Sequence, residues 1–254
     1  MIGPHTRRQA GGGGAIGSHT LGRMEKLAYL LWDASPERDL DAFRDRLLDR
    51  LPKGLADCGA SRVKILATDS DVAAGAGLHL GALAPDALVT FWLECVQDRG
   101  ASESLLSGVS GRMAGYLVVE SQPLRFETPE GPVGRRLPGF TLVGCIEPAD
   151  GVAHAEFIAT WERVHRDVAI ETQSTFSYVR NEVVRPLTAD APAWGGIVEE
   201  GFPLEALSDP RAFYDAVGDE AKYQRNLARM IESCRAFLSL EKVDSHPMSE
   251  YRFF

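Results

Sequence analysis

The feature that most constrains this chain is a pattern of strands and helices that occurs twice. Short apolar runs of strand length alternate with longer segments whose apolar residues recur at helical spacing. In each half the predicted order is strand, helix, two strands, helix and strand, which is the split βαβ or ferredoxin-like unit. The predicted strands lie at 26–32, 61–69, 86–96, 115–123, 139–147, 176–186, 193–203 and within 241–254, and the predicted helices at 40–51, 102–114, 154–171 and 208–240.

The two halves align when one is shifted over the other by 157 − 43 = 114 positions. Phe43 then falls on Phe157 and Leu47 on Trp161, so the apolar faces of the two predicted helices coincide. The sequence therefore predicts an α+β fold of two tandem ferredoxin-like repeats. We expect a disordered tail at 1–23, a first, degenerate repeat at 24–123, a Pro- and Gly-rich linker at 124–137 and a second repeat at 138–254.

The charge and composition narrow the class of protein. The chain carries a formal net charge of −9, and such an acidic body repels phosphate backbones, so we do not expect a nucleic-acid partner. No apolar run is long enough to span a bilayer, and no apolar segment follows the basic N-terminus. The four cysteines are widely spaced and form no C-x-x-C pair. These features favour a cytoplasmic protein with reduced cysteines and no membrane partner.

One histidine distinguishes the two halves. His165 lies opposite Leu51 in the alignment, four residues beyond Trp161 on the predicted helix whose apolar face holds Phe157, Trp161, Val164 and Val168. An imidazole titrates near neutral pH and suits a general acid or base. The same histidine could instead interact with the C-terminal end of the helix dipole as a capping residue.

The predicted strand at 176–186 carries polar residues on both faces. Alternation places Tyr178, Arg180 and Glu182 on one face and Asn181 on the other. Tyr178 and Arg180 are candidates to orient a polar group of a substrate, although an arginine paired with a surface carboxylate is a common alternative. Aromatic residues that could form the wall of a hydrophobic site, or simply pack in the core, are Trp194, Phe202, Phe213, Tyr214 and Tyr223.

The sequence shows no convincing motif for metal or nucleotide chemistry. Gly12, Gly14 and Gly17 formally match G-x-G-x-x-G, but no predicted strand precedes them and no predicted helix follows them. There is no H-E-x-x-H, no set of paired cysteines, no Walker loop and no G-x-S-x-G elbow. His154 and His165 are eleven residues apart on one predicted helix, too far to share a metal. We therefore expect neither a protein-ligated metal nor a cofactor.

A stretch of the second half resembles the EthD family. The resemblance rests on F-I-A-T-W-E-R-V-H at 157–165, Y-V-R-N at 178–181 and W-G-G-I-V-E-E-G-F at 194–202, and covers roughly residues 138–240. It implies ferredoxin-like units that pair into a dimeric α/β barrel. Two repeats in one chain could complete that barrel as a monomer with an internal pseudo-dimer, or the chain could form a homodimer. The first half lacks the histidine and the Tyr-Arg-Asn cluster.

The function that this resemblance implies is a cofactor-independent enzyme acting on a small hydrophobic or aromatic molecule. The family's name comes from ether degradation alongside an oxidative system, and some relatives act on aromatic polyketides as dehydratases or decarboxylases. His165 would be the general acid or base of a lyase-like or isomerising step, aided by Tyr178 and Arg180. The substrate would contact Trp161, Asn181, Trp194 and Phe202.

Two alternatives remain open at the level of sequence. The first is a non-catalytic protein that binds a hydrophobic intermediate, since a second unmistakable catalytic group is missing. The second is a haem protein, because other two-repeat α+β barrels ligate haem iron through a helix histidine. A visible absorption band would distinguish the haem protein.

Overall fold

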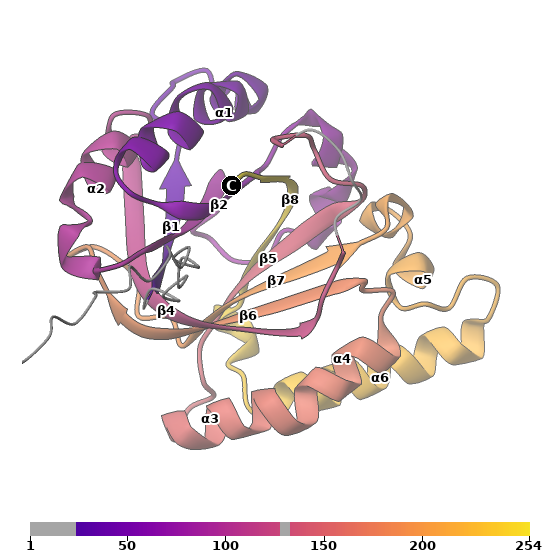
Figure 1. Ribbon diagram of the computed structural model, residues 1–254. Helices are drawn as coiled ribbons and strands as arrows, with labels where there is room; N and C mark the ends of the chain where they lie inside the picture. The colour runs from indigo at the N-terminus through magenta and orange to yellow at the C-terminus, as the bar shows by residue number, and fades with distance from the viewer. Residues whose placement is uncertain (1–23, 128–132) are drawn as a thin grey trace, which may run out of the picture.

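A closed barrel of eight antiparallel strands forms the centre of the molecule (Figure 1). The computed structural model describes residues 24–127 and 133–254, and the tail predicted at 1–23 lies outside them. Around the barrel the strands follow the order β1-β3-β2-β8-β5-β7-β6-β4. Their bounds are β1 (Glu25–Trp32), β2 (Ser61–Ala67), β3 (Ala87–Leu93), β4 (Arg112–Leu124), β5 (Phe140–Ile146), β6 (Ser177–Pro186), β7 (Gly196–Phe202) and β8 (Asp244–Arg252).

Helices cover the outside of the barrel in two separate groups (Figure 1). The first group packs on β1 to β4 and the second on the strands of the second half. No described helix is long and apolar enough to cross a membrane. The helices are α1 (Leu40–Asp57), α2 (Gly100–Ser107), α3 (His154–Thr160), α4 (Arg166–Thr172), α5 (Pro210–Phe213) and α6 (Glu220–Arg235).

The fold class expected from the sequence, two tandem ferredoxin-like repeats, is wrong. The edge strand β2 of the first half pairs with β8 of the second, and β4 pairs with β6, so all eight strands belong to one closed sheet. The physical reason is that a separate four-stranded sheet would leave two edges with unpaired backbone donors and acceptors, whereas closure pairs them all. The barrel closes within a single chain.

Alternation along the strands separates an outer face from an inner one. On β1, Leu27, Tyr29 and Leu31 pack against α1, while Ala28 and Leu30 point to the barrel interior. The interior cluster takes residues from both halves, including Tyr116, Val143, Trp194, Ile197 and Met248. Because neither half could bury these side chains alone, the inner core also couples the halves.

The helix predicted at 154–171 contains an irregularity at its centre. Between α3 and α4 the residues Trp161–His165 form a π-helical turn, in which the backbone N–H of Arg166 donates to the carbonyl of Trp161. The wider turn rotates the following residues, so Val164 is 53% exposed instead of lying on the apolar face with Trp161. Single π-turns of this kind are frequent at functional sites.

Candidate functional site

A pocket of about 210 Å³ lies between the outer face of the second half's strands and the helices that cover it. Strands β5, β6 and β7 form its floor, and the helical segments around Trp161, Phe213 and Cys234 form its walls. Most of the lining is apolar or aromatic. The polar side chains that reach it are those of His165, Gln173, Tyr178, Glu200, Tyr214 and Ser245.

His165 enters this pocket from the π-helical turn. Its side chain is buried, its Nδ1 lies 3.0 Å from the Ser233 hydroxyl on α6, and its ring lies 4.9 Å from the ring of Phe237. Burial lowers the pKa of His165 to about 4, so the imidazole is neutral at physiological pH. The helix continues to Thr172, so His165 lies in its middle and does not cap its C-terminus.

Glu200 supplies a carboxyl group from β7. Alternation turns it outward, opposite Tyr178 of β6 and Leu142 of β5. No hydrogen bond or ion pair joins this carboxyl to any other described residue, and burial raises the pKa of Glu200 to about 7. A carboxyl with such a pKa is present in both protonation states near neutral pH, which is the condition for general acid and base catalysis.

Trp161 and Tyr178 join the helix to the sheet at one side of the pocket. The indole N–H of Trp161 donates a 2.8 Å hydrogen bond to the hydroxyl oxygen of Tyr178. Burial, with the nearby Glu200 carboxylate, raises the pKa of Tyr178 well above its usual value, so the phenol keeps its proton. Tyr178 is therefore a hydrogen-bond donor whose position Trp161 fixes.

Arg180 lies behind Trp161 and does not line the pocket. Its guanidinium stacks 5.6 Å from the Trp161 ring and donates to the Ser121 hydroxyl at 3.0 and 3.1 Å. The carboxylate of Glu162 is 3.6 Å away. Arg180 therefore supports the ring of Trp161, and it has no direct path to a molecule in this pocket.

Three residues expected to contact the substrate lie elsewhere. The Asn181 side chain points into the barrel, where its amide donates to Glu199 at 2.9 Å, and Trp194 belongs to the same inner core. Phe202 stacks on Phe213 in a separate cluster. The aromatic pattern indicated burial correctly, but it could not distinguish the inner face, the outer face and the pocket wall.

The sequence-based reasoning missed Glu200. Adjacent acids in an otherwise apolar strand, Glu199 and Glu200, must point to opposite sides of the sheet, so at least one was bound to be enclosed. Gln173 was also missed, and its Oε1 is buried without a hydrogen-bond partner among the described residues. The thiol of Cys234 lines the pocket, but burial raises its pKa to about 12, so it is not a nucleophile.

The pocket does not fit a haem. Its volume of about 210 Å³ is below the range typical of cofactor sites, and none of its lining residues is a Lys or Arg that could pair with the propionates. A porphyrin beside His165 would also have to displace the rings of Trp161 and Phe237, which are packed in a shared core. Within the described residues, no group of three or more His, Cys, Asp or Glu side chains is arranged to hold a metal ion.

Comparison with known proteins finds likeness only among solved structures. No protein-family model matches the chain, and no curated protein sequence does. An anthrone oxidase-like protein is 10% identical, with 92% of each chain covered and a TM-score of 0.48. A candidate monooxygenase from Lactobacillus acidophilus is 9% identical over 91% of this chain and 94% of that one, with a TM-score of 0.44. A chlorite dismutase from Candidatus Nitrospira defluvii is 10% identical over 91% and 92%, with a TM-score of 0.38. At these values the likeness assigns the chain neither a family nor a reaction.

Proposed function

We propose that this protein is a cofactor-independent enzyme that moves a proton on a small hydrophobic or aromatic molecule bound in the pocket of the second half. The observation that carries the proposal is the Glu200 carboxyl, which faces a mainly apolar pocket with no partner among the described residues. Keeping a carboxyl in such surroundings costs stability, and catalytic sites commonly contain groups perturbed in this way. The resemblance of 157–165 and 178–181 to the EthD family also supports a site in the second half of the chain.

The geometry supports an enolisation as the central step. The Glu200 carboxylate takes a proton from a carbon next to a carbonyl, while Tyr178 or neutral His165 donates a hydrogen bond to the carbonyl oxygen as charge develops there. Return of the proton to another carbon completes an isomerisation. Alternatively, protonation of a β-hydroxyl by Glu200 lets it leave as water, which completes a dehydration.

The roles of the sequence-predicted residues change accordingly. His165 has too low a pKa to be a strong base, so we assign it to hydrogen bonding with substrate and Glu200 to proton transfer. Trp161 and Phe237 provide the aromatic wall. Arg180 becomes a positioning residue that acts through Trp161.

The test uses 2-tetralone, a neutral bicyclic ketone with an acidic carbon-bound proton. Proton NMR in D2O follows its exchange in the presence of the protein. We expect the protein to exchange this proton faster than buffer alone, with a rate that rises with pH through about 7. The rate should fall about 100-fold or more in Glu200→Gln. Glu205→Gln makes the same change at an exposed carboxylate on the following 3-10 turn. This variant should give the same exchange rate as the unmodified protein.

A second variant separates enzyme from binding protein. His165→Ala should slow the exchange of 2-tetralone at least about tenfold while the protein stays folded by circular dichroism. The enzymatic assignment is wrong if 2-tetralone binds but its proton exchanges no more slowly with Glu200→Gln and His165→Ala than with the unmodified protein. The chain is then a binding or accessory protein.

A further inference from the structure

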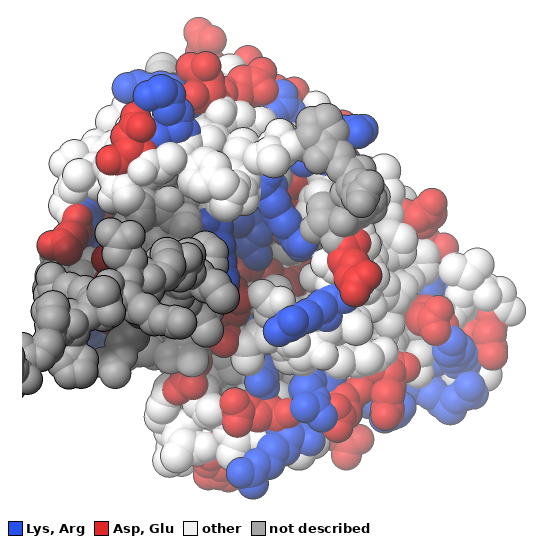
Figure 2. Space-filling model, in the orientation of Figure 1, with Lys and Arg blue, Asp and Glu red and all other residues white. Residues whose placement is uncertain are grey.

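A second cavity opens at one end of the barrel interior, on the other side of the sheet from the pocket of Glu200. It also has a volume of about 210 Å³, and its lining comes from strands of both halves. Figure 2 shows Lys and Arg side chains gathered in a hollow near the middle of this face of the molecule. Five cationic residues line the cavity: Lys26, Arg62, Lys64, Arg125 and Arg252.

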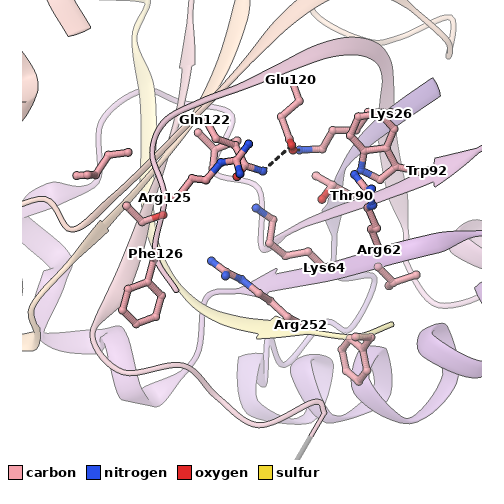
Figure 3. Close-up of a pocket in the computed structure, with 15 residues that line it drawn as sticks. Lys26, Arg62, Lys64, Thr90, Trp92, Glu120, Gln122, Arg125, Phe126 and Arg252 are labelled. Atoms are coloured by element: carbon pink, nitrogen blue, oxygen red, sulfur yellow. Dashed lines mark hydrogen bonds and ion pairs between the residues drawn. The ribbon is translucent and has the colours of Figure 1, made fainter. Parts of the chain in front are cut away.

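Strand alternation places Lys26 and Lys64 at positions that face the barrel interior. Lys26 precedes the inward-facing Ala28, and Lys64 precedes the inward-facing Leu66, in the two-residue period of a strand. Along these two strands the interior therefore changes from apolar at Ala28 and Leu66 to basic at this end. Figure 3 shows Lys64 and Arg252 reaching into the cavity, with Glu120 and Gln122 across from them.

Carboxylates inside the barrel neutralise only part of this charge. Lys26 pairs with Glu120, and its Nζ lies 3.6 Å from a Glu199 oxygen. Lys64 pairs with Glu199, and Arg252 donates to Glu250 at 2.6 Å. Among the described residues, five cations thus meet three carboxylates, an excess of two positive charges in a chain whose net charge is −9.

Two of the arginines have no carboxylate partner among the described residues. Arg62 stacks 5.5 Å from the ring of Trp92, and Arg125 follows the end of β4 on the opposite wall. Both guanidiniums are exposed at the cavity. A guanidinium in this situation offers a planar pair of donors that matches a carboxylate.

The rest of the lining is apolar. Trp92, Phe126 and Phe253 contribute aromatic rings, and Val63, Leu124 and Val179 contribute aliphatic surface. An inorganic ion would leave this surface unused. The combination of excess positive charge, paired donors and aromatic walls matches a molecule with an anionic head and an apolar body.

We infer that the end of the barrel is a binding site for a small organic carboxylate with an aromatic or branched aliphatic body. Arg62 and Arg125 bind the carboxylate, while Lys64 and Arg252, already paired with carboxylates, add to the local positive potential. The body of the ligand packs on Trp92 and Phe126. This site is independent of the proposed proton-transfer pocket, because the two cavities share no lining residue.

Benzoate is the probe for this site, and isothermal titration calorimetry measures its binding. We expect saturable binding of benzoate and at least about tenfold weaker binding of benzamide, its neutral analogue. Inorganic phosphate should also bind at least tenfold more weakly, since it lacks an apolar body. Equal affinity for benzamide would overturn the role of charge, and equal affinity for phosphate would overturn the organic carboxylate.

The matched variants remove charge without touching the buried ion pairs. The double substitution Arg62→Gln with Arg125→Gln should lower the affinity for benzoate at least tenfold. Arg50→Gln, at an exposed position of α1, should change the affinity less than twofold. Thermal unfolding of each variant checks that the fold is kept. Undiminished benzoate binding by the folded double variant, or no binding by the unmodified protein, contradicts the inference.

Discussion

At the scale of single residues, two adjacent acids show how strongly the environment sets chemistry. Glu199 points into the barrel, where Lys64 and Lys26 counter the effect of burial and lower its pKa to about 2. Glu200 points outward into an apolar pocket without a cation, and burial raises its pKa to about 7. One step along β7 therefore separates a permanently charged structural acid from a titrating one.

Glu200→Gln should stabilise the protein at alkaline pH. The folded state holds the Glu200 proton up to about pH 7, whereas the unfolded chain releases it near 4.5, so this group's contribution to stability declines as pH rises between those values. We expect the variant to exceed the unmodified protein by about 1–2 kcal/mol at pH 8 and to match it at pH 4, because Glu200 is only partly buried and solvent screening reduces the full effect. Urea unfolding at both pH values measures the difference, and a gain that is independent of pH would contradict the assignment.

Glu199→Gln should have the opposite effect. A lowered pKa contributes stability above about pH 4.5 that disappears as pH falls toward 2. Replacement leaves Lys64 and Lys26 with one carboxylate fewer inside the barrel, so we expect a loss of about 3 kcal/mol at pH 7. The same urea titration gives the value. A loss below 1 kcal/mol would mean that water at the barrel end already solvates the two ammonium groups.

At the scale of elements, the pocket depends on the close approach of β7 to the π-helical turn. Gly196 begins β7 directly under the ring of Trp161, and a side chain at that position would collide with the indole. Trp161 in turn holds Tyr178 through its indole N–H. Because Gly196 has no side chain, the ring of Trp161 can pack directly on the sheet.

Gly196→Ala should therefore disturb both stability and the pocket. The added methyl group must displace the Trp161 ring, at a cost of about 1–3 kcal/mol. Tryptophan fluorescence and urea unfolding report the two effects. Gly77→Ala, where the new methyl group meets no atom within 4 Å, is the matched control and should change neither. An unchanged Gly196→Ala protein would show that the indole has room to move.

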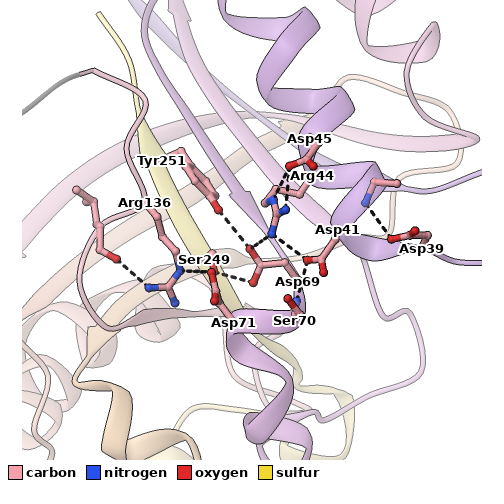
Figure 4. Close-up of polar contacts among 12 residues, drawn as sticks. Asp39, Asp41, Arg44, Asp45, Asp69, Ser70, Asp71, Arg136, Ser249 and Tyr251 are labelled. Carbon is pink, nitrogen blue, oxygen red and sulfur yellow. Dashed lines mark hydrogen bonds and ion pairs between the residues drawn. The ribbon is translucent and has the colours of Figure 1, made fainter.

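At the scale of the whole molecule, polar contacts hold the last strand to the first half. The buried Asp69 accepts hydrogen bonds from Ser249 at 2.8 Å and Tyr251 at 3.3 Å, both on β8, and from Arg44 of α1 at 3.2 Å (Figure 4). These contacts lie beside the β2–β8 pairing that closes the barrel. Asp69 therefore links the two halves at one of their two seams.

Asp69→Ala should destabilise the protein by about 3 kcal/mol, because it removes a buried carboxylate and leaves the hydroxyl groups of Ser249 and Tyr251 without this acceptor. Arg44 keeps its ion pairs with Asp41 and Asp45. Asp57→Ala, which removes an exposed partner of Lys53, should cost less than about 0.5 kcal/mol. Chemical unfolding followed by circular dichroism compares them. Equal losses would show that the seam is held by the backbone pairing alone.

The sequence indicated the elements better than their assembly. The apolar stripe of Phe43, Leu47 and Leu51 predicted α1. The helix predicted from 208 begins at Pro210, where Asp209 caps α5. The long helix predicted at 208–240 is instead two helices, α5 and α6, separated around Gly218, whose φ is +78°. Glycine adopts this conformation without strain, so Gly218 in the sequence is compatible with a break at that point.

For the site, spacing placed Trp161 and His165 on one helix, and the resemblance to the EthD family added Tyr178. The structure puts all three on one pocket. It could not assign Asn181, Trp194 and Phe202, because a residue's face follows from the register of strands that are far apart in the chain. What the sequence by itself determined is the order of strands and helices, which local hydrophobic period and capping encode. Only the tertiary structure decided that the edges of the two halves pair into one barrel, and that pairing fixes which acids are enclosed, which are neutralised and which are left to titrate.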